Sequence, residues 1–190
     1  VTFVNLSDLD GWKQSIQKNT KLFLLETPSN PLGEVVDIEK LAAISKNNDI
    51  ILAVDNCIMS PALQRPLSLG ADLVIHSATK YIDGQGRCLA GAVAGKASFV
   101  DEISSFTRST GPTLSAFNAW VVLKGLETLS LRMKAHSESA LQLARWLENQ
   151  AFVEKVHYVG LESHPHHEIA IKQQTGFGGI VSFEVKGGRK

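Results

Sequence analysis

The sequence predicts an α/β fold in which helices flank a largely parallel sheet. Short apolar runs of strand length occur at residues 22–25, 50–54, 73–75 and 89–94. Between the first two runs, Asp37–Lys46 has helical spacing that places Ile38, Leu41, Ala42 and Ala43 near one face, with Asp37 as the cap. A strand, a helix and a strand at this interval are typical of a βαβ unit with parallel strands. The runs are apolar throughout, as is usual for parallel strands buried on both faces.

The second half of the sequence changes to a helical pattern. Over Ser115–Gln150, apolar residues recur at intervals of three, four or seven. Gly125 and Ser130 weaken this pattern, which predicts a kink or two consecutive helices. Trp120 and Trp146 lie within it and are most simply core or interface residues.

Two partial domains are expected. A loop, a brief helix through Gln174 and a strand at 179–185 follow the helical stretch and begin a smaller α+β domain. We place residues 1–138 in a partial large domain that binds the cofactor inferred below, and residues 139–190 in the start of the small one. The chain opens on a strand-like run without an initiator methionine and stops just after another, so we expect a fragment of a longer protein.

Composition excludes several classes of function. The 190 residues are 44% hydrophobic and 20% charged, with zero formal net charge, so the charge balance does not favour nucleic acid or anionic membrane as a partner. No apolar stretch approaches the roughly 18 residues of a membrane span, and no signal peptide opens the chain. Cys57 and Cys88 are too few for a disulfide framework and lack metal-type spacing, so a reducing cytoplasm is the expected location.

Polar residues follow the ends of two neighbouring predicted strands. Asp55 follows the second strand, and Lys80 follows the third with Ser77 and Thr79 beside it. Ligands of parallel sheets bind beyond the carboxyl ends of the strands, so we expect these groups to converge. They suit pyridoxal phosphate: the hydroxyls hold the phosphate, Asp55 keeps the ring nitrogen protonated, and Lys80 bonds to the aldehyde. A partly desolvated lysine would serve as nucleophile and then as general base.

Each of these residues also has a structural explanation. A single aspartate at a strand end is more often a turn former or helix cap, and a single lysine is more often a solvated surface residue. The functional interpretation of Asp55 depends on Lys80, one strand further along and flanked by hydroxyls. Cys57 is expected to be a small buried apolar residue near the site.

Two further patterns carry less information. After Gly84 and Gly86, the third glycine of a dinucleotide fingerprint would fall at Leu89, so these glycines are expected in a tight turn. The segment His164–Glu168 contains three imidazoles and a carboxylate. Pro165 interrupts it and no second group of ligands stands out, so we expect no metal site.

Several motifs, in order, resemble the cysteine/methionine metabolism family of pyridoxal phosphate enzymes. They are Thr27-Pro28-Ser29-Asn30-Pro31, Val54-Asp55-Asn56, Pro66-Leu67 with Gly70-Ala71-Asp72, His76-Ser77-Ala78-Thr79-Lys80-Tyr81, Gly111-Pro112-Thr113-Leu114-Ser115, Gly125-Leu126-Glu127-Thr128-Leu129 and Gly176-Phe177-Gly178-Gly179. The resemblance covers nearly the whole chain. It implies the large domain of the fold type I architecture of PLP-dependent transferases.

The resemblance also implies roles for single residues. Lys80 is similar to the family's Schiff-base lysine, Asp55 to its ring-nitrogen partner, and Ser77 and Thr79 to its phosphate ligands. Asn30 resembles the asparagine that orients the substrate carboxylate near the cofactor. The implied ligand is a small amino acid, and the implied assembly is a homotetramer built as a dimer of dimers.

Residues 81–87, and Asp55-Asn56-Cys57 in place of the commoner Asp-Asn-Thr, resemble the O-succinylhomoserine sulfhydrylases of this family. That implies γ-replacement on O-succinyl-L-homoserine with sulfide to give homocysteine in methionine biosynthesis. One alternative is cystathionine γ-synthase or another family lyase. A second alternative is an inactive, cofactor-free fragment or assembly module, because the family's upstream phosphate turn, stacking tyrosine, N-terminal arm and C-terminal arginine are missing from these 190 residues.

Overall fold

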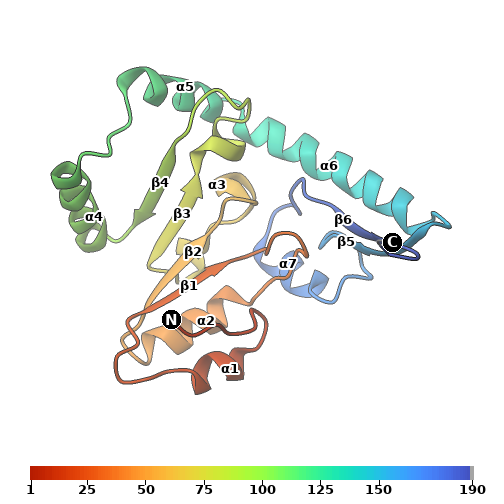
Figure 1. The fold of residues 1–190 in the computed structure, drawn as a ribbon, viewed down its shortest axis with the longest axis horizontal. Helices are drawn as coiled ribbons and strands as arrows, with labels where there is room; N and C mark the ends of the chain where they lie inside the picture. Colours follow the sequence, from red (N-terminus) through yellow and green to blue (C-terminus); the bar gives the residue numbers. More distant parts are fainter. Residues whose placement is uncertain (189–190) are drawn as a thin grey trace.

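The structure, a computed structural model, describes residues 1–188 and contains two sheets (Figure 1). The larger sheet has the strand order β1-β2-β3-β4, and the smaller pairs β5 with β6. The strands are β1 (Leu22–Glu26), β2 (Ile51–Asp55), β3 (Leu73–Ser77), β4 (Gly91–Gly95), β5 (Val153–His157) and β6 (Ser182–Val185). β1, β2 and β3 are parallel, which confirms the largely parallel sheet, and β4 runs antiparallel to β3.

Helices flank both sheets, so the predicted α/β class is confirmed. They are α1 (Leu9–Gln14), α2 (Ile38–Lys46), α3 (Ser60–Leu63), α4 (Ala97–Thr110), α5 (Ala116–Leu126), α6 (Leu129–Glu148) and α7 (His167–Gln173), with a 3₁₀ turn η1 (Pro66–Leu69) and a π turn η2 (Ala78–Ile82). Within residues 1–188, none of the helices combines the length and the apolar character that crossing a membrane would require.

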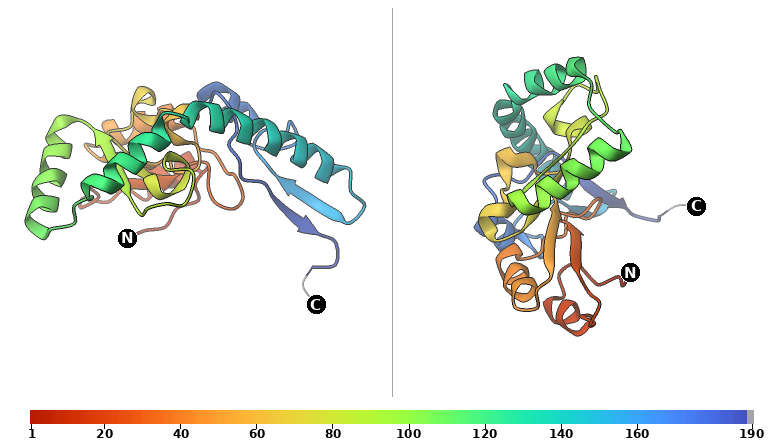
Figure 2. Two further views of the ribbon diagram at one scale, coloured as in Figure 1. Left: turned by 90° about the horizontal axis from the view of Figure 1, so that it is seen from above. Right: turned by 90° about the vertical axis from the view of Figure 1, so that its left-hand side faces the viewer.

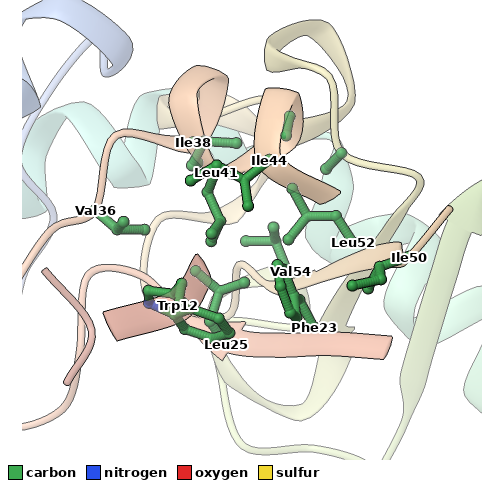
Figure 3. Close-up of a cluster of buried hydrophobic side chains, with 12 residues drawn as sticks. Trp12, Phe23, Leu25, Val36, Ile38, Leu41, Ile44, Ile50, Leu52 and Val54 are labelled. Carbon is green, nitrogen blue, oxygen red and sulfur yellow. The ribbon is translucent and has the colours of Figure 1, made fainter. Parts of the chain in front are cut away.

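The main hydrophobic core lies between one face of the larger sheet and helices α1 and α2 (Figure 3). Its buried side chains are Trp12, Phe23, Leu25, Val36, Ile38, Leu41, Ala42, Ile44, Ile50, Leu52, Val54 and Ala71. The rings of Trp12 and Phe23 meet edge to face with centroids 4.9 Å apart. Burial of each large aliphatic side chain here contributes roughly 1.5–3 kcal/mol, so this layer holds β1 and β2 against the two helices.

Helix α2 shows how the sequence pattern specifies this packing. The Oδ1 atom of Asp37 accepts a hydrogen bond from the Lys40 amide at 3.1 Å, which confirms the predicted cap. Ile38, Leu41 and Ile44 are buried at spacings of three. The prediction of Ala43 on the apolar face is wrong, because that residue lies on the exposed side of the stripe and Ile44 is buried beside it.

Strand β4 begins later than predicted and runs the other way from β1–β3. Its ladder with β3 starts at Gly91, opposite Ser77, whereas Leu89 is 81% exposed and precedes the strand. The link from β3 to β4 contains no crossover helix of the kind that parallel strands need, and the pair is antiparallel.

Helix α4 and strand β5 were not predicted. No side chain of α4 is buried, although Phe99, Ile103 and Phe106 recur at helical spacing.

The helical stretch 115–150 contains two consecutive helices, α5 and α6, which confirms one of the two predicted alternatives. Helix α6 reaches from the larger sheet to the smaller one (Figure 2). Leu129 and Met133, near its start, pack in a cluster with α3, and Ala140 and Ala144 pack against Tyr158 after β5. The helix passes without a break through residue 138, where the domain boundary was placed, and that boundary stays a prediction. The last strand, β6, is shorter than the predicted 179–185.

Candidate active site

The carboxyl ends of β1, β2 and β3 carry the polar residues of the candidate site. β1 ends at Glu26, β2 at Asp55 and β3 at Ser77, and the register pairs Glu26 with Asp55 and Asp55 with Ile75. Because the three strands are parallel, their carboxyl ends lie at one edge of the sheet. The structure therefore brings Asp55 and Ser77 to the same edge, with Thr79 and Lys80 in the turn that follows.

Asp55 points away from the hydrophobic core. Val54 is buried in that core, and side chains alternate between the faces of a strand, so Asp55 lies on the opposite face. Its side chain is half-buried, and Oδ1 accepts a hydrogen bond from the Cys57 amide at 2.9 Å. This local bond orients the carboxylate and leaves further acceptor positions on it for a ligand.

Glu26 is a carboxylate at the same edge that the sequence analysis missed. Burial raises the pKa of Glu26, a hydrogen bond from the Asn30 amide at 3.2 Å lowers it, and the charge of Asp55 raises it, with a net upward shift. Its position at the end of β1 is equivalent to that of Asp55 at the end of β2. The strand-end rule that selected Asp55 would therefore have found Glu26.

The predicted site lysine lies in the π turn η2, directly after β3. The ψ angle of Lys80 is −118°, outside the helical range of the residues around it. The side chain of Lys80 is exposed, so its predicted partial desolvation is wrong within the described residues. Among residues 1–188, the Nζ atom of Lys80 has no hydrogen-bond or ion-pair partner.

Arg132 of α6 holds this turn from a distance in sequence. Its guanidinium donates hydrogen bonds to the carbonyl oxygens of Tyr81 at 2.8 Å and Ile82 at 3.3 Å, and to that of Gly125 at 2.8 Å. Gly84 has a φ of +73°, and a Cβ atom there would overlap the Arg132 guanidinium. The predicted tight turn at Gly84 is thus a position where only glycine lets Arg132 reach the backbone.

The two site hydroxyls differ. Oγ1 of Thr79 accepts a hydrogen bond from the Ala90 amide at 2.9 Å and donates one to the Ala90 carbonyl at 3.2 Å, which ties the turn to the start of β4. The hydroxyl of Ser77 has no hydrogen-bond partner within the described residues, while the Ser77 amide donates to Sγ of Cys57 at 2.7 Å. Ser77 is therefore free to bind a ligand, and Thr79 must first release Ala90.

Asn30 lies further from this cluster along the chain. Its side chain is exposed in the loop after β1, and its amide contacts Glu26 rather than Asp55. The structure thus groups Asp55, Ser77 and the Lys80 turn, and connects Asn30 to them through Glu26. The assigned roles of all five predicted residues stay predictions.

The histidine segment forms hydrogen bonds with backbone atoms. Nδ1 of His166 accepts from the Val35 amide at 2.9 Å, Nε2 of His164 contacts the Leu32 carbonyl at 3.2 Å, and Nδ1 of His167 contacts the Val159 carbonyl at 2.7 Å. The bonds of His166 and His164 attach the loop after β1 to the second half of the chain, and that of His167 lies within the second half. Within residues 1–188, the structure shows no group of three or more histidine, cysteine or acidic side chains placed to hold a metal.

The model of the Cys/Met metabolism PLP-dependent enzyme family matches residues 1–190. The chain belongs to this family. The family's cofactor is PLP, and the curated relatives that the chain matches are enzymes of sulfur amino-acid metabolism. The expected family, cofactor and enzyme class are therefore confirmed.

Relatives of this PLP-dependent chain include several activities. The chain is 61% identical to O-succinylhomoserine sulfhydrylase of Pseudomonas aeruginosa over 189 residues, which cover 100% of the chain and 47% of that protein. It is 46% identical to cystathionine beta-lyase of Lactococcus lactis subsp. cremoris, over 96% of the chain and 48% of that protein. The crystal structure of cystathionine gamma synthase from Xanthomonas oryzae pv. oryzae in complex with cystathionine superposes with a TM-score of 0.94 at 40% identity, over 97% of this chain and 48% of that one. The chain spans about half the length of these relatives.

The residues present fit PLP. A carboxylate at Asp55 suits a protonated ring nitrogen, and the unpartnered hydroxyl of Ser77 suits a phosphate oxygen. The unpartnered amine of Lys80 suits the aldehyde. All three come from one sheet edge, where a ligand would contact them together.

Proposed function

We propose that the protein containing this chain replaces the succinyl ester of O-succinyl-L-homoserine with sulfide and so forms homocysteine for methionine biosynthesis. The 61% identity over the whole chain to the Pseudomonas aeruginosa O-succinylhomoserine sulfhydrylase carries this proposal. The lyase and synthase relatives share the family but are 46% and 40% identical. The synthase relative defines the main alternative, in which cysteine rather than sulfide is the nucleophile. The lyase relative defines a second one, in which the enzyme cleaves its substrate.

Each site residue has a distinct task in this reaction. Bound PLP supplies an electron sink for charge that develops at the substrate's α-carbon. Asp55 accepts a hydrogen bond from the protonated ring nitrogen, and such charge-assisted bonds contribute about 1.5–3 kcal/mol net. Ser77 and Thr79 donate hydrogen bonds to the phosphate, and Asn30 orients the substrate carboxylate.

Lys80 is the catalytic residue of the proposal. Its amine removes a proton from the α-carbon and later one from the β-carbon of the substrate, so that succinate leaves from the γ-carbon. After sulfide has added at the γ-carbon, the amine returns one proton to each of the two carbons. The geometry supports this role because Arg132 and Gly84 fix the backbone of the turn while the amine itself has no partner in residues 1–188. A fixed backbone with a free amine is what proton transfer between neighbouring carbons needs.

A product assay on the full-length protein tests the reaction. The enzyme receives O-succinyl-L-homoserine with either sulfide or cysteine, and homocysteine and cystathionine are measured separately. We expect kcat/KM to be at least tenfold higher for sulfide. Cystathionine as the main product would assign a synthase instead. If no product forms and borohydride fixes no pyridoxyl group on Lys80, the cofactor-free module replaces both enzymes.

We also propose that the full-length protein is a homotetramer. Helix α5 supports self-association, since Phe117, Trp120 and Leu123 are 70%, 54% and 55% exposed. Trp146 is 53% exposed as well, so neither tryptophan of the helical stretch is a core residue of this chain. Light scattering coupled to size-exclusion chromatography measures the assembly, and a monomeric mass would overturn this part of the proposal.

A further inference from the structure

Cys57 lies between the two strand ends of the candidate site. Its Sγ atom accepts a hydrogen bond from the Ser77 amide at 2.7 Å. The Cys57 amide donates a hydrogen bond to Oδ1 of Asp55 at 2.9 Å. One residue therefore contacts both the Asp55 carboxylate and the backbone of Ser77. The expectation of a simple apolar residue at Cys57 is wrong.

The position of Cys57 explains why these contacts form. The last backbone bond between the loop after β2 and β3 runs from the Asn56 amide to the Ile75 carbonyl at 2.9 Å. The β2–β3 register ends where Asp55 pairs with Ile75. The next amide of β3 on the side of β2 is that of Ser77, and it lies beyond the last backbone acceptor of β2. The thiol of Cys57 occupies that acceptor position and extends the connection between the strands by one bond.

The thiol of Cys57 is protonated at neutral pH. Burial raises its pKa, and the neighbouring carboxylates of Asp55 and Glu26 raise it further, while the bond from the Ser77 amide lowers it; the resulting value is about 11. A protonated thiol can stay beside a carboxylate, whereas a thiolate would be repelled by it. Cys57 is therefore unsuited to act as a nucleophile, and its sulfur remains an acceptor for the Ser77 amide.

We propose that Cys57 is a positioning residue that ties the carboxylate of Asp55 to the backbone of Ser77. If Asp55 and Ser77 have the roles assigned under Proposed function, Cys57 fixes the separation between the group that holds the ring nitrogen and the group that holds the phosphate. A ligand that contacts both then meets them already in place, with less conformational entropy to lose on binding.

Cofactor affinity in the full-length protein tests this role. We expect Cys57→Ala to raise the dissociation constant of PLP three- to tenfold in a fluorescence titration. Cys57→Ser, which keeps a donor and an acceptor, should stay within twofold of the wild type, as should Cys88→Ala, the other half-buried cysteine. If Cys57→Ala binds normally, or Cys57→Ser binds as weakly as Cys57→Ala, the hydrogen bonds have no positioning role.

A second measurement needs neither cofactor nor activity. In full-length protein freed of PLP, Cys57 is alkylated with iodoacetamide at pH 8 and the modified peptide is quantified by mass spectrometry. Asp55→Asn removes the carboxylate that raises the thiol's pKa, so alkylation of Cys57 should be at least threefold faster, with the rate at Cys88 unchanged. An unchanged rate at Cys57 would refute the contact itself. A faster rate in a protein without sulfhydrylase activity would refute the proposed reaction and leave the contact standing.

Discussion

Two polar loops of this chain use their side chains in opposite ways. The site edge, defined by Asp55, Ser77 and Lys80, leaves the Ser77 hydroxyl and the Lys80 amine without partners among residues 1–188. The histidine loop, residues 164–167, uses each of its three imidazoles for a hydrogen bond to a backbone atom of another segment. Polar groups left unpartnered on a fixed backbone point to binding, and polar groups that are all satisfied point to structure.

The same contrast appears in the backbone around each loop. At the site edge, Arg132 fixes the turn through the carbonyl oxygens of Tyr81 and Ile82, so the side chain of Lys80 is not needed to hold it. At the histidine loop, the side chains themselves are the attachment. Removing a side chain should therefore abolish chemistry at the first loop and reduce stability at the second.

The largest expected effect is at Lys80. Lys80→Ala in the full-length protein should lower kcat at least 10³-fold, because no other amine of the site edge can transfer the proton, whereas the thermal unfolding midpoint should change by less than about 2 °C. Steady-state assays and calorimetry measure the two quantities. Lys80→Arg is the matched control: it keeps the charge but cannot lose its proton, so it should be equally inactive. A variant at Lys80 with normal turnover would reject the assignment.

A smaller effect is expected at Gly84, where the backbone of the site edge is held. Gly84→Ala should destabilise the protein by about 2–4 kcal/mol, because alanine is strained at positive φ and its Cβ would displace Arg132 from the turn. Gly86→Ala is the matched control, since Gly86 has a φ of +67° but open space around it. Gly86→Ala should lower the unfolding free energy by about 1 kcal/mol. If Gly84→Ala and Gly86→Ala lose the same unfolding free energy in denaturant titrations, displacement of Arg132 costs nothing beyond the backbone strain.

The fold was predictable where local pattern decides it. The apolar runs that became β1, β2 and β3 and the cap at Asp37 were all visible in the sequence, because apolar strand residues and capping leave short-range signals. The expected burial on both faces is wrong for β1, where Leu22 and Leu24 are 48% and 58% exposed. The antiparallel direction of β4 was not predictable from the sequence, because it depends on how the chain returns to the sheet after η2. Strand β5 is too mixed in composition, with exposed Glu154 and Lys155, to stand out as a strand.

The site was predictable only in part, for a similar reason. Asp55, Ser77 and Lys80 were found from their places after apolar runs. Arg132 lies about fifty residues from the turn that it holds, and only the packing of α6 brings it there. Cys57 looked apolar because a thiol's hydrogen bonds depend on its neighbours in space, here the amide of Ser77.

The smallest effect is expected at the histidine loop, and it concerns pH. Burial lowers the pKa of His164 below its ordinary 6.5. The hydrogen bond with the Leu32 carbonyl raises this pKa, and electrostatic repulsion from His166, His157 and Lys155 lowers it further. His164 is thus neutral in the folded protein, with Nδ1 accepting from the His166 amide at 3.2 Å and Nε2 facing the Leu32 carbonyl. The unfolded chain binds a proton at a higher pH than the folded one. The stability that this histidine contributes is therefore complete above pH 6.5 and lost as the pH falls through its folded pKa.

The prediction separates the two loops. The unfolding free energy of the full-length protein should decrease from pH 6.5 to 5, and His164→Gln should flatten that decrease while costing about 1 kcal/mol at pH 7. PLP affinity should be unchanged in the same variant. The hydrogen bonds of the histidine loop join segments of this chain, and within residues 1–188 none of them involves Asp55, Ser77 or Lys80. If His164→Gln instead weakened PLP binding and left the slope intact, the histidine loop would belong to the site, and unpartnered polar groups would no longer distinguish the chemical loop from the structural one.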